Sequence, residues 1–274
     1  MNFKQHLVIV RGGGDLATGV VYRLHRAGFP VIVTELERPL VVRRQVALAT
    51  AVLESHIQVE TLHGQLAHTP TEAEQLAQTS VIPVLISPTL PNLQSPISIV
   101  VDARMAKRNI DTSKDQAPLV IALGPGFTAG ADCHAVVETM RGHWLGRVIW
   151  QGAAIPDTGT PGLVSGKGAE RVLRAPVAGM VDWRVEIGDF VSEGQILGDV
   201  AGAVVAAPFA GVVRGLIAPG TAVCAGLKIG DLDARGEREA CFTISDKALA
   251  IGGGVVEAVL TWLNQPPQDV YKIC

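Results

Sequence analysis

An aliphatic segment that runs directly into a glycine-rich turn constrains this chain most. Residues 7–10 read LVIV, and the sequence RGGGDLATGV follows from Arg11 to Val20. This order predicts a strand, a Gly-x-Gly-x-x-Ala turn and a helix, which is how open parallel sheets cradle the pyrophosphate of a dinucleotide. The sequence therefore predicts an α/β fold with a Rossmann-like parallel sheet.

The residues of the turn have separate expected roles. Gly12 suits the positive φ of a tight turn, Gly14 lets the backbone approach a phosphate, and Ala17 lets the helix pack close to the strand. The N–H groups of the first helical turn would then face an anion. The predicted cofactor-binding residues of this segment are Gly12, Gly13, Gly14, Asp15, Leu16 and Ala17.

The sequence after the turn supports this interpretation. A helix is expected over 15–27, and the next strand, over 31–34, ends at Glu35, 21 residues beyond Gly14. An acidic residue at this spacing meets a ribose hydroxyl in dinucleotide-binding folds. Arg38, with Arg43 and Arg44, follows; these side chains either bind an anion such as a 2′-phosphate or cover a helix surface. A glycine turn that binds nothing remains the alternative.

Composition excludes several classes of protein. The chain has 274 residues, is 48% hydrophobic, and carries a formal net charge of −3 without a long basic run, so we expect two domains and no nucleic-acid partner. No apolar run reaches the length of a membrane span and no signal-peptide core precedes the first strand, which favours the cytoplasm. The four cysteines are scattered and lack zinc-site spacing, so we expect reduced thiols.

The two halves of the chain follow different patterns. Through about residue 155, strand and helix candidates alternate, as expected for a parallel sheet, and a stretch rich in proline and glycine follows at 156–162. We therefore predict a nucleotide- or cofactor-binding domain over 1–155. The predicted strands cover residues 7–10, 31–34, 84–86, 98–101, 119–123 and 147–150.

The second half contains an internal repeat. Residues 175–200 align without a gap on residues 207–232, with ten identical positions that are mostly glycines and small residues. Each unit reads as short strands broken by a glycine-centred turn, so two units would close a small β-sandwich about a pseudo-twofold axis. We place this all-β domain at 163–244. A helix follows within 245–274 and contains three consecutive glycines, 252–254, which would permit close packing against another element.

The repeat unit resembles the halves of biotinyl and lipoyl carrier domains, which have a barrel-sandwich hybrid fold. A working carrier needs a lysine at the hairpin between the two halves, but here that hairpin reads VAGAVVA over 200–206. Without the amine, covalent attachment of a prosthetic group is not expected. The resemblance therefore implies a domain that packs or docks, without biotin or lipoate.

A second glycine loop carries the candidate for chemistry. The strand expected over 119–123 leads into GPGFTAGADCH, and a helix ending at Gly142 is expected to follow. A cysteine in the first turn of such a helix would be favoured as a thiolate, and His134 beside it would add a donor or a charge. Cys133 is thus the candidate nucleophile or soft-metal ligand, although a buried structural cysteine is the alternative. The same loop contributes Gly124, Gly126 and Phe127 as candidate cofactor contacts.

A third candidate segment, VDARMAKRN, follows the strand expected over 98–101. Asp102, Lys107 and Arg108 would lie at the same edge of the sheet as the two glycine loops. Lysine and arginine at this edge either hold a phosphate or carboxylate, or form a solvated charged surface.

Taken together, these segments, with SDKALAIGGGVVEAVL near the end, resemble the YqeB family of accessory proteins of selenium-dependent molybdenum hydroxylases, which are related to XdhC-type chaperones. The resemblance implies a role in maturation: handling a molybdopterin-type cofactor for an apo-hydroxylase, together with cofactor-modifying proteins. A dinucleotide form of that cofactor contains a pyrophosphate, and Cys133 would be a soft ligand for its metal. A Cys133→Ser variant is then expected to fold without activating the hydroxylase.

Two other hypotheses stay open. The same glycine turn would serve a NAD(P)-dependent oxidoreductase, although no Tyr-x-x-x-Lys pair is present, since Tyr22 and Tyr271 are the chain's tyrosines. Alternatively, the chain is a binding module whose sandwich docks on a partner enzyme. The chain is also a candidate homo-oligomer.

Overall fold

A nine-stranded sheet forms the centre of the first half of the chain. The computed structural model describes residues 3–159 and 166–264, and the sheet has the order β10-β9-β7-β6-β1-β2-β5-β4-β3. The seven strands from β9 to β4 are parallel, while β3 and β10 are antiparallel at the two edges. The strands are β1 (Leu7–Arg11), β2 (Val31–Glu35), β3 (His56–Val59), β4 (Leu62–Ala67), β5 (Val81–Ile86), β6 (Ile97–Asp102), β7 (Leu119–Leu123), β9 (Ala135–Val137) and β10 (Val148–Ile149).

Both faces of this sheet are covered. On one face Val8, Val10 and Val33 pack against α1 (Asp15–Arg26) and α4 (Asp246–Asn264). On the other face Ile9 and Ile32 belong to a cluster that includes α3 (Pro70–Ala77). Because neighbouring strand residues point to opposite faces, a doubly covered parallel sheet needs continuous aliphatic runs, and the chain supplies them.

Most predicted strands are confirmed. The runs at 7–10, 31–34, 84–86, 98–101 and 119–123 lie in β1, β2, β5, β6 and β7, and the helix expected over 15–27 is α1. Residues 147–150 contribute only the short antiparallel edge strand β10. The predicted linker is described only up to residue 159, since residues 160–162 lie outside the described residues.

The remaining elements of this half are short. The helix α3 starts at an N-cap, Thr69, whose hydroxyl accepts a hydrogen bond from the Glu72 amide, while the Glu72 carboxylate accepts one from the His68 amide just before the cap. The other elements are α2 (Thr50–Glu54), the two-stranded pair of β8 (Thr128–Ala129) and β11 (Gly152–Ala153), and the 3₁₀ helices η1 (Arg44–Val46) and η2 (Lys114–Gln116).

The helix expected between His134 and Gly142 is wrong. Residues 135–137 form β9, which pairs in parallel with β7 and antiparallel with β10. The three apolar residues Ala135, Val136 and Val137 extend the sheet, and the chain then turns at Gly142, which has φ +130°. A short apolar run fits a buried strand as well as a helix turn, and here sheet pairing decides.

The internal repeat folds into two four-stranded sheets that correspond strand by strand. Their orders are β12-β19-β17-β14 and β16-β15-β13-β18, and the offset of 32 residues converts one order into the other. The strands are β12 (Val172–Arg174), β13 (Gly179–Trp183), β14 (Phe190–Val191), β15 (Ile196–Val200), β16 (Ala203–Ala206), β17 (Gly211–Leu216), β18 (Ala222–Val223) and β19 (Lys228–Asp233). The repeat is therefore a structural duplication, as the sequence predicts.

The hairpin between the two repeats is tight. The strands β15 and β16 pair with Val200 opposite Ala203, which leaves a two-residue turn. Ala201 and Gly202 in that turn have φ +50° and +83°, as a type I′ turn requires. The turn carries no lysine. The 3₁₀ helices η3 (Ala169–Arg171) and η4 (Arg238–Cys241) flank the two sheets.

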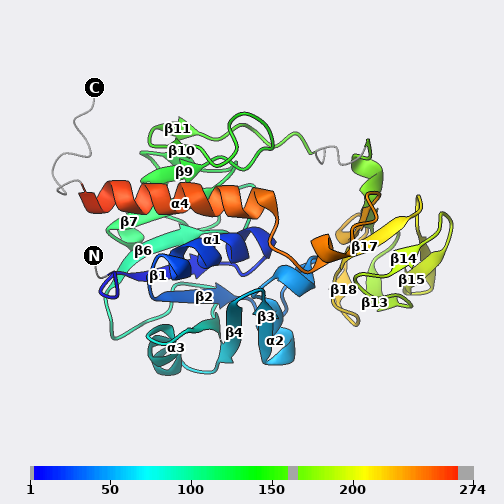
Figure 1. The fold of residues 1–274 in the computed structure, drawn as a ribbon, viewed down its shortest axis with the longest axis horizontal. Helices are drawn as coiled ribbons and strands as arrows, with labels where there is room; N and C mark the ends of the chain where they lie inside the picture. Colours follow the sequence, from blue (N-terminus) through cyan, green and yellow to red (C-terminus); the bar gives the residue numbers. More distant parts are fainter. Residues whose placement is uncertain (1–2, 160–165, 265–274) are drawn as a thin grey trace.

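After the sandwich the chain returns to the first half. Figure 1 shows α4 lying along α1, away from the sandwich strands. A Cβ on Gly19 would overlap the Ala248 backbone, and a Cβ on Gly252 would overlap the Gly19 carbonyl oxygen. Gly254 in the same way approaches the Gly146 carbonyl. The close packing expected of the glycines at 252–254 is therefore confirmed for two of the three.

Gly253 supplies a matched control, because a Cβ there would meet no atom within 4 Å. We expect Gly252→Ala to lower the free energy of unfolding by about 2 kcal/mol through overpacking against α1. Gly253→Ala is expected to raise it by up to about 1 kcal/mol, because alanine is the better helix former. Urea denaturation of both variants measures this difference, and equal effects would contradict the packing described for α1 and α4.

Candidate functional site

The carboxyl ends of the parallel strands β1, β6 and β7 lie side by side at one edge of the sheet. Beside β1, the order in which successive strands are added to the sheet changes direction. The strand following β1 in sequence, β2, lies on one side of β1, and β6, which continues to β7, lies on the other. In open parallel sheets, ligands bind at this edge beside such a switch point. The candidate site consists of three loops there: residues 11–17, 102–109 and 124–134.

The first loop has the expected turn geometry. Gly12 has φ +91° and its amide donates to the Thr34 carbonyl at 2.8 Å. A Cβ on Gly12 would lie 3.0 Å from the Arg104 Cα, so this glycine also permits the approach of the second loop. The left-handed conformation predicted for Gly12 is confirmed.

Gly13 and Gly14 have different surroundings. A Cβ on Gly13 would lie 2.7 Å from the Ala49 amide nitrogen, and the Gly13 carbonyl accepts a hydrogen bond from that amide. The chain before α2 thus occupies this side of the turn. A Cβ on Gly14, by contrast, would meet only the Val41 side chain, at 3.9 Å. Gly14 therefore leaves space in front of the first turn of α1.

Glu35 connects the end of β2 to the glycine turn. Its Oε1 accepts the Gly13 amide at 2.8 Å and its Oε2 accepts the Leu36 amide at 2.7 Å. Burial raises the pKa of this carboxyl above its ordinary value, and the two amide hydrogen bonds oppose that shift. Each carboxylate oxygen keeps a further acceptor site, so Glu35 is able to accept a ligand hydroxyl.

The basic residues after β2 separate into two groups. Arg38 is exposed. Arg43 donates to the Ala240 carbonyl at 2.9 Å and lies 3.4 Å from the Asp15 carboxylate, and Arg44 donates to the Leu216 carbonyl at 2.8 Å. Arg43 and Arg44 therefore connect the first half of the chain to the sandwich, an alternative that sequence reasoning missed.

A buried polar network lies beneath the first two loops. Asp102 is 1% exposed and accepts hydrogen bonds from Arg104 and from the Thr112 hydroxyl, both at 2.6 Å. Arg11, also 1% exposed, donates to Asp111 at 2.8 Å, and Asp111 lies 2.7 Å from Arg104. These two arginines hold the pKa of the Asp111 carboxyl below its ordinary value.

This network fixes the shape of the loops. Asp102 is engaged by its own neighbours, so its carboxylate positions the loop and does not face a ligand. Sequence reasoning missed Arg11, Asp111 and Thr112. A charged residue ending an aliphatic strand, as Arg11 does, is the signal that could have identified the network.

The second loop contains two side-chain-bearing residues in the left-handed region. Met105 has φ +55° and Lys107 has φ +59°. Such conformations carry strain and occur preferentially at functional segments. Lys107 is 55% exposed on its side chain and lies 2.7 Å from Asp157, and Arg108 is exposed. Lys107 and Arg108 therefore fit the alternative of a solvated charged surface better than a ligand site.

The third loop packs on the second. A Cβ on Gly126 would lie 2.5 Å from the Arg108 amide, so this glycine, at φ +104°, permits the contact between the loops. Gly124, at φ +71°, similarly packs against the Thr139 side chain. Phe127 is buried in the same cluster as Cys133. The third loop thus packs on the second loop, and Phe127 acts as a core residue.

Cys133 has no thiolate character in this fold. It is fully buried, and burial together with the Asp132 charge raises the pKa of its thiol to about 12. The expectation of a lowered pKa is wrong because it required a helix N-terminus, and β9 stands in place of that helix. Cys133 is therefore the buried structural cysteine that the sequence offered as the alternative.

The Nδ1 atom of His134 is an acceptor and does not donate a hydrogen bond to the Cys133 thiol. This Nδ1 accepts the Val120 amide at 2.9 Å, which places the proton of a neutral ring on Nε2. Burial and the Lys114 charge lower the pKa of His134. Within residues 3–159 and 166–264, no three His, Cys, Asp or Glu side chains lie together as a metal site.

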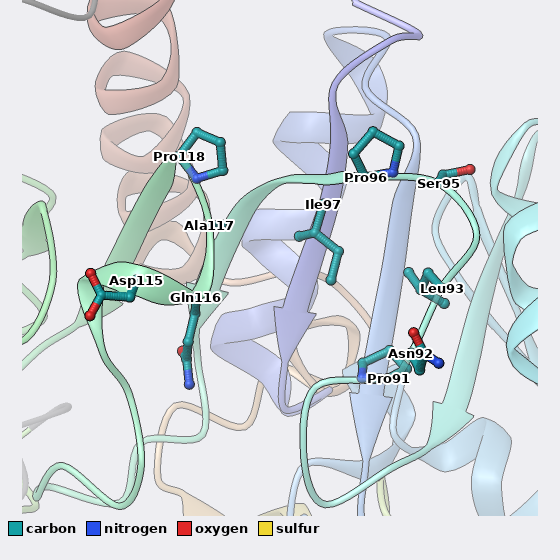
Figure 2. A pocket seen from close by; sticks show the side chains of 10 residues that line it. All are labelled: Pro91, Asn92, Leu93, Ser95, Pro96, Ile97, Asp115, Gln116, Ala117 and Pro118. Atoms are coloured by element: carbon teal, nitrogen blue, oxygen red, sulfur yellow. The ribbon is translucent and has the colours of Figure 1, made fainter.

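Another hollow lies at the opposite edge of the sheet. Figure 2 shows the pocket, of about 570 Å³, where β6 and β7 begin. Its lining includes Pro91, Pro96 and Pro118, with Asp115 and Gln116 beside them. It lies at the amino ends of the strands, away from the three loops, and is not part of the candidate site.

The described part of the chain contains no helix long and apolar enough to cross a membrane. The cysteines described, Cys133, Cys224 and Cys241, are all free, as expected, while Cys274 lies outside the described residues.

Comparisons with known proteins give one strong similarity. No family model matches the chain. It is 49% identical over 261 residues to the uncharacterized protein YqeB of Escherichia coli K12, which covers 94% of this chain and 48% of YqeB. The similarity supports the predicted resemblance to the YqeB family, and the chain spans about half the length of that relative. The relation to XdhC-type chaperones and to carrier domains stays a prediction.

A search of solved structures returns a succinylglutamate desuccinylase/aspartoacylase from Rhodobacter sphaeroides. It covers 82% of this chain and 86% of its own, with 12% identity and a TM-score of 0.23. A likeness this low carries no argument about fold or activity.

The environment of Cys133 predicts its reactivity. At pH 8 a thiol with a pKa near 12 is thiolate in about one molecule in 10,000, whereas Cys224 is exposed. We expect iodoacetamide to alkylate Cys224 in the native protein and to leave Cys133 unmodified until the chain is unfolded. Peptide mass spectrometry measures the alkylation of the two cysteines separately. Rapid alkylation of Cys133 in the folded protein would contradict its burial.

Proposed function

We propose that this chain is an accessory protein in the maturation of a molybdenum hydroxylase, selenium-dependent as in the family it resembles, and that it binds the nucleotide part of a molybdopterin-type cofactor. The observation that carries the proposal is the glycine turn at the switch point, where Gly14 leaves open space before α1 and the Glu35 carboxylate accepts the Gly13 amide. The 49% identity to YqeB supports the resemblance to that family, and the maturation role is inferred from that resemblance.

The residues of the turn fit a pyrophosphate. The absence of a Cβ at Gly14 lets an oxyanion approach, and the amides that begin α1 present partial positive charge. Asp15 is the unfavourable group in this first turn, and Arg43 at 3.4 Å offsets its charge. Glu35 would accept a ribose hydroxyl. A bound cofactor of this class would supply molybdenum redox chemistry to the hydroxylase that receives it.

Cys133 does not fit the role of a metal ligand to that cofactor. Its sulfur is buried in a hydrophobic cluster with Phe127 and Val136, and its thiol stays protonated at neutral pH. Of the predicted site segments, the proposal therefore uses the glycine turn and Glu35, and not the loop that carries Cys133. A chain that holds the cofactor through its nucleotide and transfers it to an apo-hydroxylase needs no nucleophile of its own.

A NAD(P)-dependent oxidoreductase is the second candidate. The same turn and Glu35 would bind the adenosine half of NAD, and the exposed Arg38 just beyond β2 is placed to meet a 2′-phosphate. An oxidoreductase would oxidise or reduce the nicotinamide when a substrate is added, whereas an accessory protein would act only together with a partner enzyme.

The identity of the bound nucleotide separates these two functions. We expect protein purified anaerobically from a molybdenum-replete host to release a pterin nucleotide on denaturation. Pterin fluorescence after oxidation, together with mass spectrometry of the released small molecules, measures it. Release of NAD(P) without pterin would contradict the maturation role and favour the oxidoreductase.

A substitution at Gly14 tests the location of the site. Gly14→Val places a branched side chain in the open space before α1, so we expect cofactor affinity to fall at least about tenfold, or about 1.4 kcal/mol, and cofactor occupancy to fall with it. Valine is a poor N-cap and costs the fold about 1 kcal/mol.

The matched control is Thr69→Ala, which removes the N-cap of α3 at a similar cost and lies away from the three loops. We expect this variant to keep its occupancy. Equal occupancy in Gly14→Val and Thr69→Ala would exclude the glycine turn as the binding site.

A further inference from the structure

Three arginine side chains gather where the second repeat of the sandwich meets the first half of the chain. Arg43 precedes η1, Arg171 ends η3, and Arg214 lies in β17; each is at most 9% exposed. The Arg43 backbone pairs with Leu216 at the end of β17. This arginine cluster, defined as Arg43, Arg171 and Arg214, is thus built at a contact between two parts of the fold.

A β-bulge places Arg214 in the cluster. In the pairing of β17 with β19, Val213 lies opposite Leu232 and Gly215 lies opposite Asp231, so Arg214 is the extra residue. Bulges redirect side chains and recur beside functional sites. The repeat offers an internal comparison, because the corresponding residue, Asp182, pairs regularly with Asp199 and is exposed. The bulge and the arginine are therefore specific to the second repeat.

Two of the three guanidinium groups, those of Arg43 and Arg214, have unused hydrogen-bonding capacity. Among the described residues, the buried Nε atoms of Arg43 and Arg214 have no hydrogen-bond partner. Arg214 lies 3.7 Å from both Asp231 and Asp233, which is longer than a charge-assisted hydrogen bond. A buried donor without a partner is costly, so these groups favour an additional acceptor.

The charges around the cluster do not balance. The ion pairs linked through it contain five cations and four carboxylates among the described residues. Burial and the Arg43 charge lower the pKa of Arg214, which shows the mutual repulsion of the guanidinium groups. The cations are Arg43, Arg171, Arg214, Lys228 and Arg235, and the carboxylates are Asp15, Asp231, Asp233 and Glu237.

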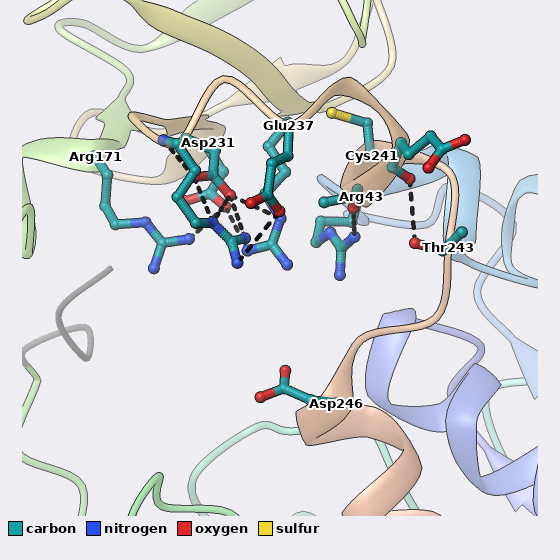
Figure 3. Close-up of polar contacts among 12 residues, drawn as sticks. Arg43, Arg171, Asp231, Glu237, Cys241, Thr243 and Asp246 are labelled. Carbon is teal, nitrogen blue, oxygen red and sulfur yellow. Dashed lines mark hydrogen bonds and ion pairs between the residues drawn. The ribbon is translucent and has the colours of Figure 1, made fainter. Parts of the chain in front are cut away.

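The carboxylate that faces the cluster across the junction is already neutralised. Figure 3 shows Arg43 and Arg171 pointing to the side on which Asp246 begins α4. Asp246 is held by Arg141 through two hydrogen bonds, at 2.7 and 2.9 Å. Lys247 beside it is another cation.

We propose that the arginine cluster binds a phosphate group at the junction of the sandwich and the first half of the chain. The planar guanidinium fork binds phosphate oxygens in pairs, and arginine supplies this geometry where lysine does not. Free phosphate and the phosphate of a larger ligand share this chemistry. The cluster is a second site beside the glycine turn, to which the ion pair of Arg43 with Asp15 joins it, and phosphate binding there does not depend on the proposed function.

Calorimetric titration of the full chain tests the site, with inorganic phosphate as the probe and ionic strength held constant with chloride. We expect one phosphate per chain and a rise in Tm, because a ligand that binds the folded state stabilises it. Arg214→Gln is expected to lower phosphate affinity at least tenfold. The control is Arg184→Gln, an arginine of the first repeat that is 61% exposed on its side chain and lies 3.9 Å from Asp199.

Adenosine monophosphate as a second probe distinguishes the sources: affinity equal to that of phosphate indicates recognition of the phosphoryl group alone, and tighter binding indicates a nucleotide. Absence of binding by wild-type protein would overturn the proposal. The proposal would also be overturned if folded Arg214→Gln bound phosphate as tightly as the wild type. It would be overturned as well if Gly14→Val lost phosphate binding while Arg214→Gln kept it.

Arg214→Gln is a buried substitution, so circular dichroism must show that it folds. Two further variants, Arg43→Lys and Arg171→Lys, keep the positive charge and replace the planar guanidinium fork with a single ammonium group. A tenfold loss of phosphate affinity in either variant, with an unchanged Tm in the absence of phosphate, supports the site. Unchanged phosphate affinity in both would exclude it.

Discussion

The close contact between α1 and α4 is the interaction on which the arrangement of this molecule depends. The chain builds the sheet, leaves it to form the sandwich, and returns as α4 to cover the sheet beside α1. Gly19 and Gly252 let the two helix backbones approach more closely than any side chain would allow. This contact fixes the end of the chain that follows the sandwich to the first half, and it also holds the helix that begins at the glycine turn.

A second constraint explains why the loops at the carboxyl edge have a defined shape. Arg11 and Asp102 end neighbouring strands, pair in register and are both buried. A buried charge needs a partner, and Arg104 in the second loop, with Asp111 and Thr112 just after it, supplies the partners. These charges therefore hold the loop that lies between the glycine turn and the third loop. Ligand recognition is left to the backbone of the turn and to Glu35.

The sequence predicts what depends on local periodicity and on duplication. The aliphatic runs identify the central strands, and the repeat identifies two matching sheets, because each pattern is contained in the residues themselves. The segment after Cys133 shows the limit. Ala135, Val136 and Val137 have no period long enough to separate helix from strand, and the free edge of β7 decides between them. The thiolate argument then fails, since it required the helix dipole.

The arginine cluster shows a different limit. An arginine within a strand is expected to be exposed, and nothing local distinguishes Arg214 from Arg184. Burial of Arg214 follows from the bulge, which depends on the register between β17 and β19, and from Arg43, which lies 171 residues earlier in the chain. The duplication nevertheless contains a signal, because position 214 carries arginine where position 182 carries aspartate. In this protein the copy that carries the arginine is the one whose strand β17 pairs with residue 43 of the first half.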